Sequence, residues 1–382
     1  MAILRKIAAS LAISSLIGAT VAHPGDSKEV VRHEKAMRGH AQAHARRAIT
    51  GCAEETTALK ARSVARRAAA AQALREKRGL TDKRMRSKRD QAALEKYLNV
   101  SHDASESGYS LDTPLDVIFS SNATAALIPE VTIGPYWVAG ELIRADVTDN
   151  EPGVPLHLDM QFIDLNTCEA VPNMLIDIWH SNATGTYSGV AMMGQAGLNT
   201  TYCRGIQTTN EDGVVEFDTV FPGHYIGRTP HIHVMSTTNA TVLPNNTYVL
   251  DGKTNHIGQL FFDQSLIDSV EELEPYNLNK QPLTLNINDG IDAQTSTADY
   301  DPFVDYIQLG ESLQDGLLSY ITVFVDTTSN QTAYAHPAAH YYEGGGVASP
   351  GGGFPGGPGF PPGGPGGPGG PFPPPPNSTQ AA

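Results

Sequence analysis

The sequence predicts a mainly β protein, a sandwich or a barrel, with a helical arm before the sheets and an irregular tail after them. From residue 112 onward, short runs of Val, Ile, Leu and Phe alternate with Gly, Pro, Asn and Asp, which is typical of all-β domains. Residues 23–98 are instead rich in Ala, Arg, Lys and Glu. Residues 344–376 hold 15 Gly and 12 Pro, a composition that does not form a packed core.

The first 22 residues predict a secretory signal peptide. Arg5 and Lys6 form a short positive region, residues 7–17 are apolar, and residues 20–22 are small, as at a cleavage site. The apolar run is too short to span a membrane, and no other stretch approaches about 20 consecutive apolar residues. We therefore expect a secreted, extracellular protein without a transmembrane segment.

Glycosylation and cysteine content fit a secretory route. Eight Asn-x-Ser/Thr acceptors suggest a glycoprotein, at Asn99, Asn122, Asn182, Asn199, Asn239, Asn245, Asn330 and Asn377. The chain has three cysteines, and an oxidising compartment permits a disulfide. Our hypothesis pairs Cys168 with Cys203 and leaves Cys52 free or paired elsewhere.

Residues 23–111 predict a basic helical arm or a propeptide. Residues 53–78 contain strong helix formers and almost no helix breakers, so we expect a helix there. Dibasic pairs at Lys77-Arg78, Lys83-Arg84 and Lys88-Arg89 are suited to a processing protease. Composition alone does not decide between removal and retention of the arm.

The distribution of charge argues against a nucleic-acid partner. Residues 1–89 have 20 basic and 7 acidic side chains, a net charge of +13, whereas residues 90–382 have 6 and 34, a net charge of −28. Phosphate backbones repel so acidic a body. We expect this body to be one domain at residues 112–335, followed by a disordered Gly/Pro-rich tail at 336–382. Association with a cell wall or another surface, through the arm or the tail, stays an open prediction.

One segment, residues 222–233, brings together several side chains that can serve a metal site. His231 and His233 are two residues apart, so in a strand they point to the same face and can bind one metal ion. Tyr225, Arg228 and Pro230 lie in the same dozen residues, after a turn-forming Pro-Gly.

A second cluster lies upstream, where an apolar strand ends in Trp179 and His180 and a Gly turn then presents Tyr187. A phenolate is a hard, strongly donating ligand that favours Fe(III), and imidazole can fill the remaining positions. Two tyrosines and two histidines together therefore predict a ferric site. We expect Trp179 to be a core residue.

With these motifs in place, the sequence resembles the intradiol ring-cleavage dioxygenases, and specifically their secreted fungal-type branch. The matching segments follow one another in the family's order and extend over about residues 113–325. They are residues 134–136, 179–180, 185–188, 204–205, 212–213, 221–225, 228–233 and 259–262.

The resemblance implies a β-sandwich core and a non-haem Fe(III) held by Tyr187, Tyr225, His231 and His233. By analogy, Tyr225 is also catalytic, as the axial tyrosinate that leaves when a catecholate chelates the iron. Arg228 matches the arginine that stabilises the substrate carbanion, and Gln259 matches the glutamine lining the same site. The implied reaction, part of aromatic compound catabolism, cleaves a small aromatic diol with O2 to a muconate-type diacid.

Two other functions are compatible with parts of the pattern. A zinc hydrolase could use His231 and His233, but no third ligand with a general-base carboxylate is evident at a typical spacing. A non-catalytic extracellular binding or cell-wall protein could use the same fold, although such a protein has no need of two tyrosinates. If the chain is a dioxygenase, its few cations favour neutral catechols or hydroxyquinols over protocatechuate.

Overall fold

The computed structural model describes residues 52, 56–80, 125–126, 133–244, 247–249, 251–289, 302–342 and 344–350. The predicted signal peptide, the dibasic pairs beyond residue 80 and the Gly/Pro-rich segment after residue 350 lie outside these residues. In the described ranges, no helix has the length and apolar character needed to cross a membrane.

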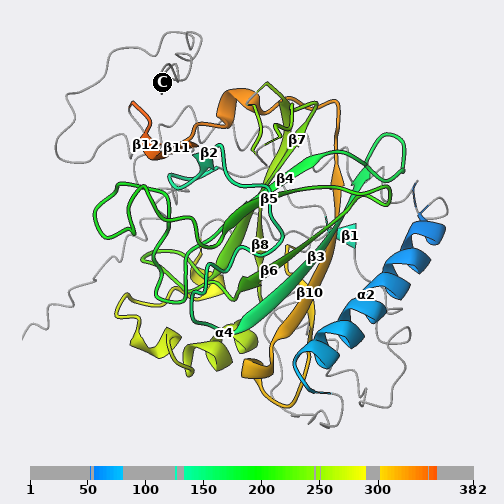
Figure 1. Cartoon of the computed structure of the whole chain (residues 1–382). Helices are drawn as coiled ribbons and strands as arrows, with labels where there is room; N and C mark the ends of the chain where they lie inside the picture. Colours follow the sequence, from blue (N-terminus) through cyan, green and yellow to red (C-terminus); the bar gives the residue numbers. More distant parts are fainter. Residues whose placement is uncertain are drawn as a thin grey trace, which may run out of the picture.

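Two sheets form the body of the molecule (Figure 1). The first contains, in spatial order, β1 (Ala125–Ala126), β10 (Leu317–Val325), β3 (Pro155–Asp164) and β6 (Val214–Val220), with β9 (Asp305–Gln308) also paired to β10. The second has the order β5 (Arg204–Thr208), β4 (Leu175–Trp179), β7 (His231–Thr238) and β8 (Lys253–Phe261). The second sheet is antiparallel throughout, whereas β10 pairs in parallel with β3 and β1.

The main core lies between these sheets, as the predicted sandwich requires. Because side chains alternate along a strand, β3 points Leu158 and Phe162 inward, where one apolar cluster joins them to Ile178 of β4 and Ile232 of β7. The intervening residue Asp159 faces the other side of the first sheet, against the arm. The prediction of a mainly β protein with a sandwich core is confirmed.

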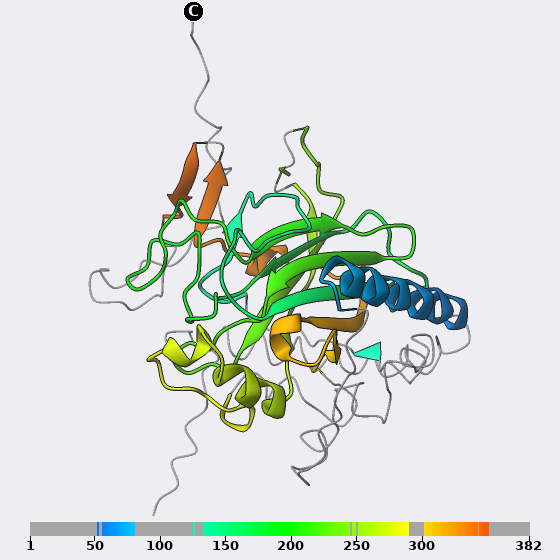
Figure 2. The same ribbon diagram turned by 60° about the horizontal axis from the view of Figure 1, so that its bottom comes forward.

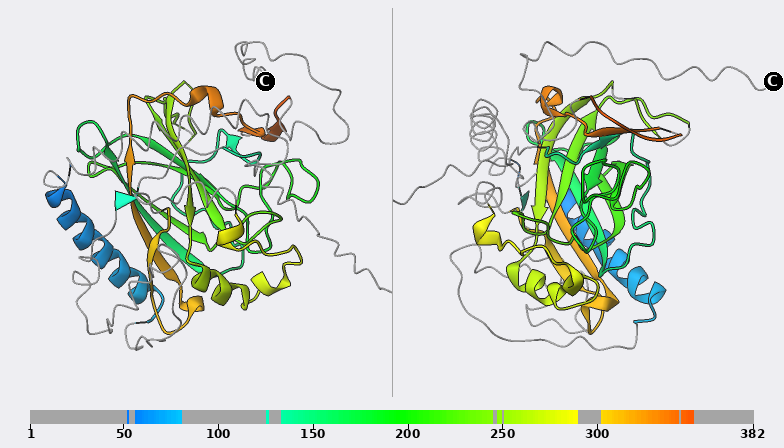
Figure 3. Two further views of the ribbon diagram at one scale, coloured as in Figure 1. Left: turned by 180° about the vertical axis from the view of Figure 1, so that it is seen from behind. Right: turned by 90° about the vertical axis from the view of Figure 1, so that its left-hand side faces the viewer.

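The remaining elements surround the two sheets. A helix, α4 (Gln264–Glu271), lies at one end of the molecule and a small hairpin at the other (Figure 3). The hairpin strands β11 (Ala339–Tyr342) and β12 (Gly345–Ala348) form a third sheet with β2 (Val138–Ala139). Short 3-10 helices occur at Tyr276–Leu278, Asn286–Asn288, Leu313–Asp315 and Thr332–Tyr334.

This hairpin corrects the predicted start of the tail. The sequence placed residues 336–382 in a disordered segment, but β11 and β12 fall within that range. Ala339 is fully buried and pairs with Val138 of β2, so the chain is held here by a distant partner strand. The local Gly content gave no sign of that partner.

The predicted arm helix exists as α2 (Thr57–Lys77) and lies along the outer face of the first sheet (Figures 1 and 2). Ala71 and Leu74 pack against Leu318 and Tyr320 of β10. The buried face of the helix is not purely apolar, because it also contains Arg67 and Arg75.

That charged face meets Asp159, which is fully buried. Arg66 donates to both carboxylate oxygens of Asp159 at 2.8 and 2.9 Å, and Arg67 donates through Nε at 2.9 Å. Burial alone would raise the pKa of Asp159, but Arg67 and Arg66 outweigh it and hold the pKa below its ordinary value. A buried carboxylate shared by two guanidiniums therefore joins the arm to the body.

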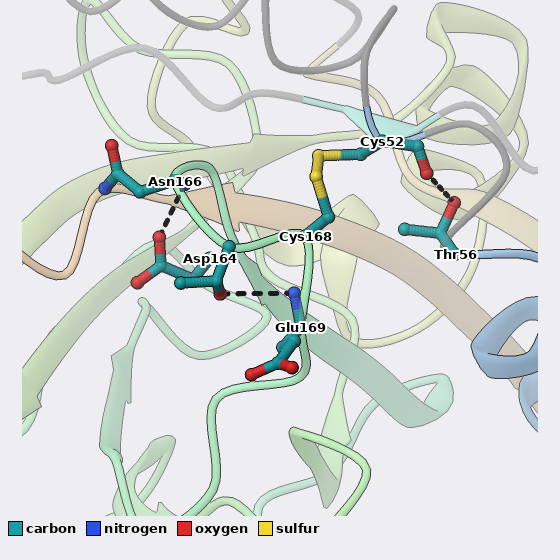
Figure 4. The surroundings of a disulfide bond; sticks show 7 residues. Cys52, Thr56, Asp164, Asn166, Cys168 and Glu169 are labelled. Carbon is teal, nitrogen blue, oxygen red and sulfur yellow. Dashed lines mark hydrogen bonds between the residues drawn. A yellow bond between two sulfur atoms is a disulfide. The ribbon is translucent and has the colours of Figure 1, made fainter.

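The disulfide differs from our hypothesis, because Cys168 pairs with Cys52 of the arm (Figure 4). Cys203 is a free, buried thiol. Cys168 lies in the turn after β3, next to the start of α2, where the Thr56 hydroxyl donates to the Cys52 carbonyl at 2.8 Å. Cys203 packs between Tyr202 and Val220. The hypothesis failed because it treated the arm and the body as separate units.

We predict that Asp159→Asn lowers the free energy of unfolding by about 3–5 kcal/mol, because it leaves the buried Arg67 guanidinium without a counter-charge. Chemical denaturation of the disulfide-intact protein measures this change. Arg62→Gln is the matched control, since Arg62 pairs with Asp212 from the same helix but at the surface and should unfold at the wild-type midpoint. An Asp159→Asn midpoint equal to that of the wild type would contradict the account.

Candidate active site

The four predicted metal ligands lie together on the outer face of the second sheet. His231 and His233 open β7 and point away from the main core, which the intervening Ile232 enters. Tyr187 comes from the connection between β4 and β5, and Tyr225 from the connection between β6 and β7. All four side chains are buried, with exposures from 0% to 7%.

Gly185 lets these two connections approach each other. Its φ of +75° is a conformation that favours glycine, and a Cβ at this position would collide with the carbonyl oxygen of His224. The close approach sets Tyr187 and Tyr225 edge to face, with ring centroids 5.4 Å apart. A tight turn from Tyr225 to Arg228, closed by a 3.0 Å backbone hydrogen bond, then brings Arg228 back beside the tyrosine.

The donor atoms have the separations expected of ligands to one ion. The Nε2 atoms of His231 and His233 are 3.2 Å apart, and Tyr225 Oη lies 3.4 Å from His231 Nε2. Two donors bound to one metal at about 2.1 Å and at right angles are about 3 Å apart. His231 Nδ1 donates to the Thr229 carbonyl at 2.6 Å, which leaves the Nε2 lone pair toward the other donors.

The chemistry of the donor set fits a hard trivalent ion. In the described part of the chain, no group of three or more His, Cys, Asp and Glu side chains could hold a metal. A metal bound by His231 and His233 would therefore take phenolate oxygen from Tyr187 and Tyr225, the pairing that Fe(III) prefers. The residues present fit ferric iron.

The ionisation of the two tyrosines depends on such a cation. Burial raises the pKa of Tyr187 well above its ordinary value, and the neighbouring Tyr225 raises it further. Burial also raises the pKa of Tyr225, although the charge of Arg228 opposes this. A bound cation reverses this direction, because it stabilises the phenolate.

Arg228 is held in place by two side chains and faces Tyr225. It donates through Nη2 to Gln259 Oε1 at 2.5 Å and through Nε to Asp289 Oδ2 at 2.8 Å, and its Nη1 lies 3.4 Å from Tyr225 Oη. Burial would lower the pKa of Arg228, but Tyr225 and Asp289 outweigh it and raise the pKa, so the group stays charged. The structure thus places Arg228 and Gln259 beside Tyr225, one of the four candidate ligands.

Two residues of the site were missed by the sequence reasoning. Asp289 is fully buried, pairs with Arg228 and also accepts from the Thr229 amide at 2.8 Å, yet it is 61 positions away in a segment without a motif. Tyr136 stacks on Tyr187 at a centroid distance of 4.2 Å and an angle of 17°. Residues 134–136 are among the segments that match the family, but the sequence predicted no role for the Tyr136 ring.

Trp179 is buried, as predicted, and stacks on the His233 ring at 4.8 Å with an angle of 6°.

Asn182, a candidate glycosylation site, has its side-chain amide hydrogen-bonded within the loop that leads to Tyr187. Its Nδ2 donates to Glu151 at 2.8 Å, and its Oδ1 accepts from Thr184 and Thr186. The side chain thereby orders the backbone just before Tyr187.

Comparison with known proteins points to one family. The family model described as Dioxygenase matches residues 134–241. An intradiol ring-cleavage dioxygenase from Tetranychus urticae is 30% identical over 54% of this chain and 98% of its own, with a TM-score of 0.45. No curated protein matches the chain.

Two bacterial structures are more distant. The dioxygenase domain of a dioxygenase carbohydrate-binding protein fusion from Streptomyces sp. SirexAA-E is 23% identical over 52% of this chain and 98% of its own, with a TM-score of 0.34. Catechol 1,2-dioxygenase from Acinetobacter sp. ADP1 is 19% identical over 56% and 68%, with a TM-score of 0.37.

The assignment rests on the matched family model and on the identity that extends over nearly the whole Tetranychus urticae protein. The segment matched by the family model contains Tyr187, Tyr225, His231 and His233. The zinc hydrolase and the non-catalytic binding protein are therefore set aside. This chain belongs to the intradiol ring-cleavage dioxygenases.

Proposed function

We propose that this enzyme is a secreted, Fe(III)-dependent dioxygenase that cleaves catechol-type diols to muconate-type diacids. The observation that supports it most is the convergence of two buried tyrosines and two buried histidines, with the two imidazole Nε2 atoms 3.2 Å apart. Secretion rests on the sequence of residues 1–22. Membership of the secreted fungal-type branch and attachment to a surface through the arm or the tail stay predictions.

Tyr187, Tyr225, His231 and His233 would hold the iron. When bound, Fe(III) supplies Lewis-acid chemistry and accepts electron density from a chelated diol. The Thr229 carbonyl fixes the His231 tautomer, and the Trp179 ring holds the plane of His233. Three of these four residues are at most 2% exposed, so a metal that they hold would be shielded from bulk water.

Tyr225 is the ligand best placed to accept a proton from the diol. Its oxygen lies 3.4 Å from Arg228 Nη1 and 3.4 Å from His231 Nε2, whereas Tyr187 is more enclosed. As a phenolate, Tyr225 can take a hydroxyl proton from the incoming substrate.

Arg228 then faces a substrate that gains negative charge during attack by O2. Its guanidinium stays charged and is fixed on both sides by Gln259 and Asp289, so it need not reorganise as charge develops. Asp289 also accepts a hydrogen bond from the Thr229 backbone amide. This bond holds the turn that contains Arg228 together with the start of β7.

We predict that the iron-loaded enzyme incorporates both atoms of ¹⁸O2 into one muconate-type product. The aromatic ring opens between its two oxygen-bearing carbons, and each new carboxyl group takes one oxygen atom from O2. Mass spectrometry of the product, with oxygen uptake, measures this. Tyr187→Phe should lose iron and turnover, whereas Tyr248→Phe, which alters another buried tyrosine, should keep both. Cleavage outside the diol, or no turnover by protein with a full complement of iron, would contradict the proposed reaction.

We also predict a higher kcat/KM for catechol than for protocatechuate, because few cations remain to bind a ring carboxylate. Among the described cations of the body, Arg144 pairs with Asp149 and Arg228 with Asp289. Arg204 donates to the Ser188 carbonyl and Lys253 to the Thr327 carbonyl. Lys280 is exposed, so Lys280→Met serves as the control and should leave the ratio unchanged. A preference for protocatechuate would refute this substrate class.

A further inference from the structure

Arg204 is a buried cation of the second sheet that takes no part in the reaction proposed for Tyr225 and Arg228. It is the first residue of β5 and is fully buried. In the pairing of the four strands, Arg204 lies opposite Trp179, Trp179 opposite His233, and His233 opposite Gln259. Directly paired residues of an antiparallel sheet point to the same face, so Arg204 shares the face that holds the donor group.

The guanidinium of Arg204 holds the residue that follows the Tyr187 ligand. Its Nε and Nη2 donate to the Ser188 carbonyl at 3.0 and 2.6 Å, and Nε also lies 2.9 Å from the Ser188 hydroxyl. Ser188 Oγ in turn donates to the Tyr202 carbonyl at 2.6 Å. These bonds fix the backbone on the C-terminal side of Tyr187.

The charge of Arg204 also acts on the tyrosine ring. Its Cζ lies 5.9 Å from the centroid of the Tyr187 ring, within the range at which a cation interacts with an aromatic face. The nearest acidic group, Glu141, is 3.8 Å away, and Nη1 forms no hydrogen bond within the described residues. The positive charge is therefore only loosely paired, in a buried setting where charges interact strongly.

We propose that Arg204 is a positioning residue for the Tyr187 ligand, which it orients through Ser188 and whose phenolate charge it stabilises. Arg228 faces the oxygen of Tyr225, and Arg204 lies over the ring of Tyr187. A nearby cation makes Tyr187 a weaker electron donor to a metal. This inference rests on the proposed ferric site.

Visible absorption of the full-length protein loaded with Fe(III), without substrate, tests the proposal. Transfer of an electron from tyrosinate to iron costs more when a cation stabilises the phenolate. Arg204→Met should therefore move the absorption maximum to longer wavelength, by on the order of 10 nm for a partly screened unit charge. Arg204→Lys keeps the charge and should restore most of the wild-type maximum.

Arg67→Met is the matched control, because Arg67 is also buried but belongs to α2 and pairs with Asp159 of the first sheet, away from Tyr187. It should leave the maximum unchanged. A wild-type maximum in Arg204→Met, or an equal shift in Arg204→Lys and Arg204→Met, would overturn the proposed effect of charge. If the wild-type protein with bound iron has no visible band, the ferric site itself fails, and this outcome is distinct from failure of the Arg204 proposal.

Glu141→Gln provides a second test if Arg204→Met does not fold. It removes a negative charge beside Arg204, so the maximum should move to shorter wavelength. The measurement belongs at pH 8.5, since burial raises the pKa of Glu141 to about 7 and the wild-type carboxyl is then ionised. No shift, or a shift to longer wavelength, would contradict the proposal.

Discussion

The site depends on the strand register of the second sheet. One row of directly paired residues crosses all four strands, with Arg204, Trp179, His233 and Gln259 in sequence. A slip of one residue would turn His231 and His233 into the main core and bring Ile232 to the outer face. The alternation of apolar and functional side chains along β7 makes that slip costly, because buried imidazoles would lose their partners.

Around this row, three of the four predicted metal ligands are each held by a neighbouring group that is not itself a predicted ligand. The Thr229 carbonyl sets the tautomer of His231, Trp179 stacks on His233, and Tyr136 stacks on Tyr187. Asp289 and Gln259 fix Arg228 from opposite sides. Such support would matter for the proposed iron site, because a small displacement of a ligand changes both metal affinity and electron donation.

The sequence pointed to the four candidate metal ligands but not to the distant residues that hold the site in place. Strand periodicity places His231 and His233 on one face of β7, whereas the resemblance to the family added Tyr187 and Tyr225. That these four residues bind a metal stays a prediction. Asp289 meets Arg228 only through tertiary packing, and Cys52 meets Cys168 only because α2 docks on the first sheet. The same reason explains the incorrect Cys168–Cys203 pairing and the early start predicted for the tail. Contacts between distant segments leave no local signal in a single sequence.

The central claim is that the two tyrosines and two histidines bind ferric iron and that a diol binds directly to it. Anaerobic titration of catechol into the iron-loaded protein, followed by visible absorption, tests this most directly. We expect a broad tyrosinate-to-iron band that shifts as catechol is added, in proportion to bound iron. A colourless protein that holds zinc instead of iron, or a band that catechol leaves unchanged, would contradict the account.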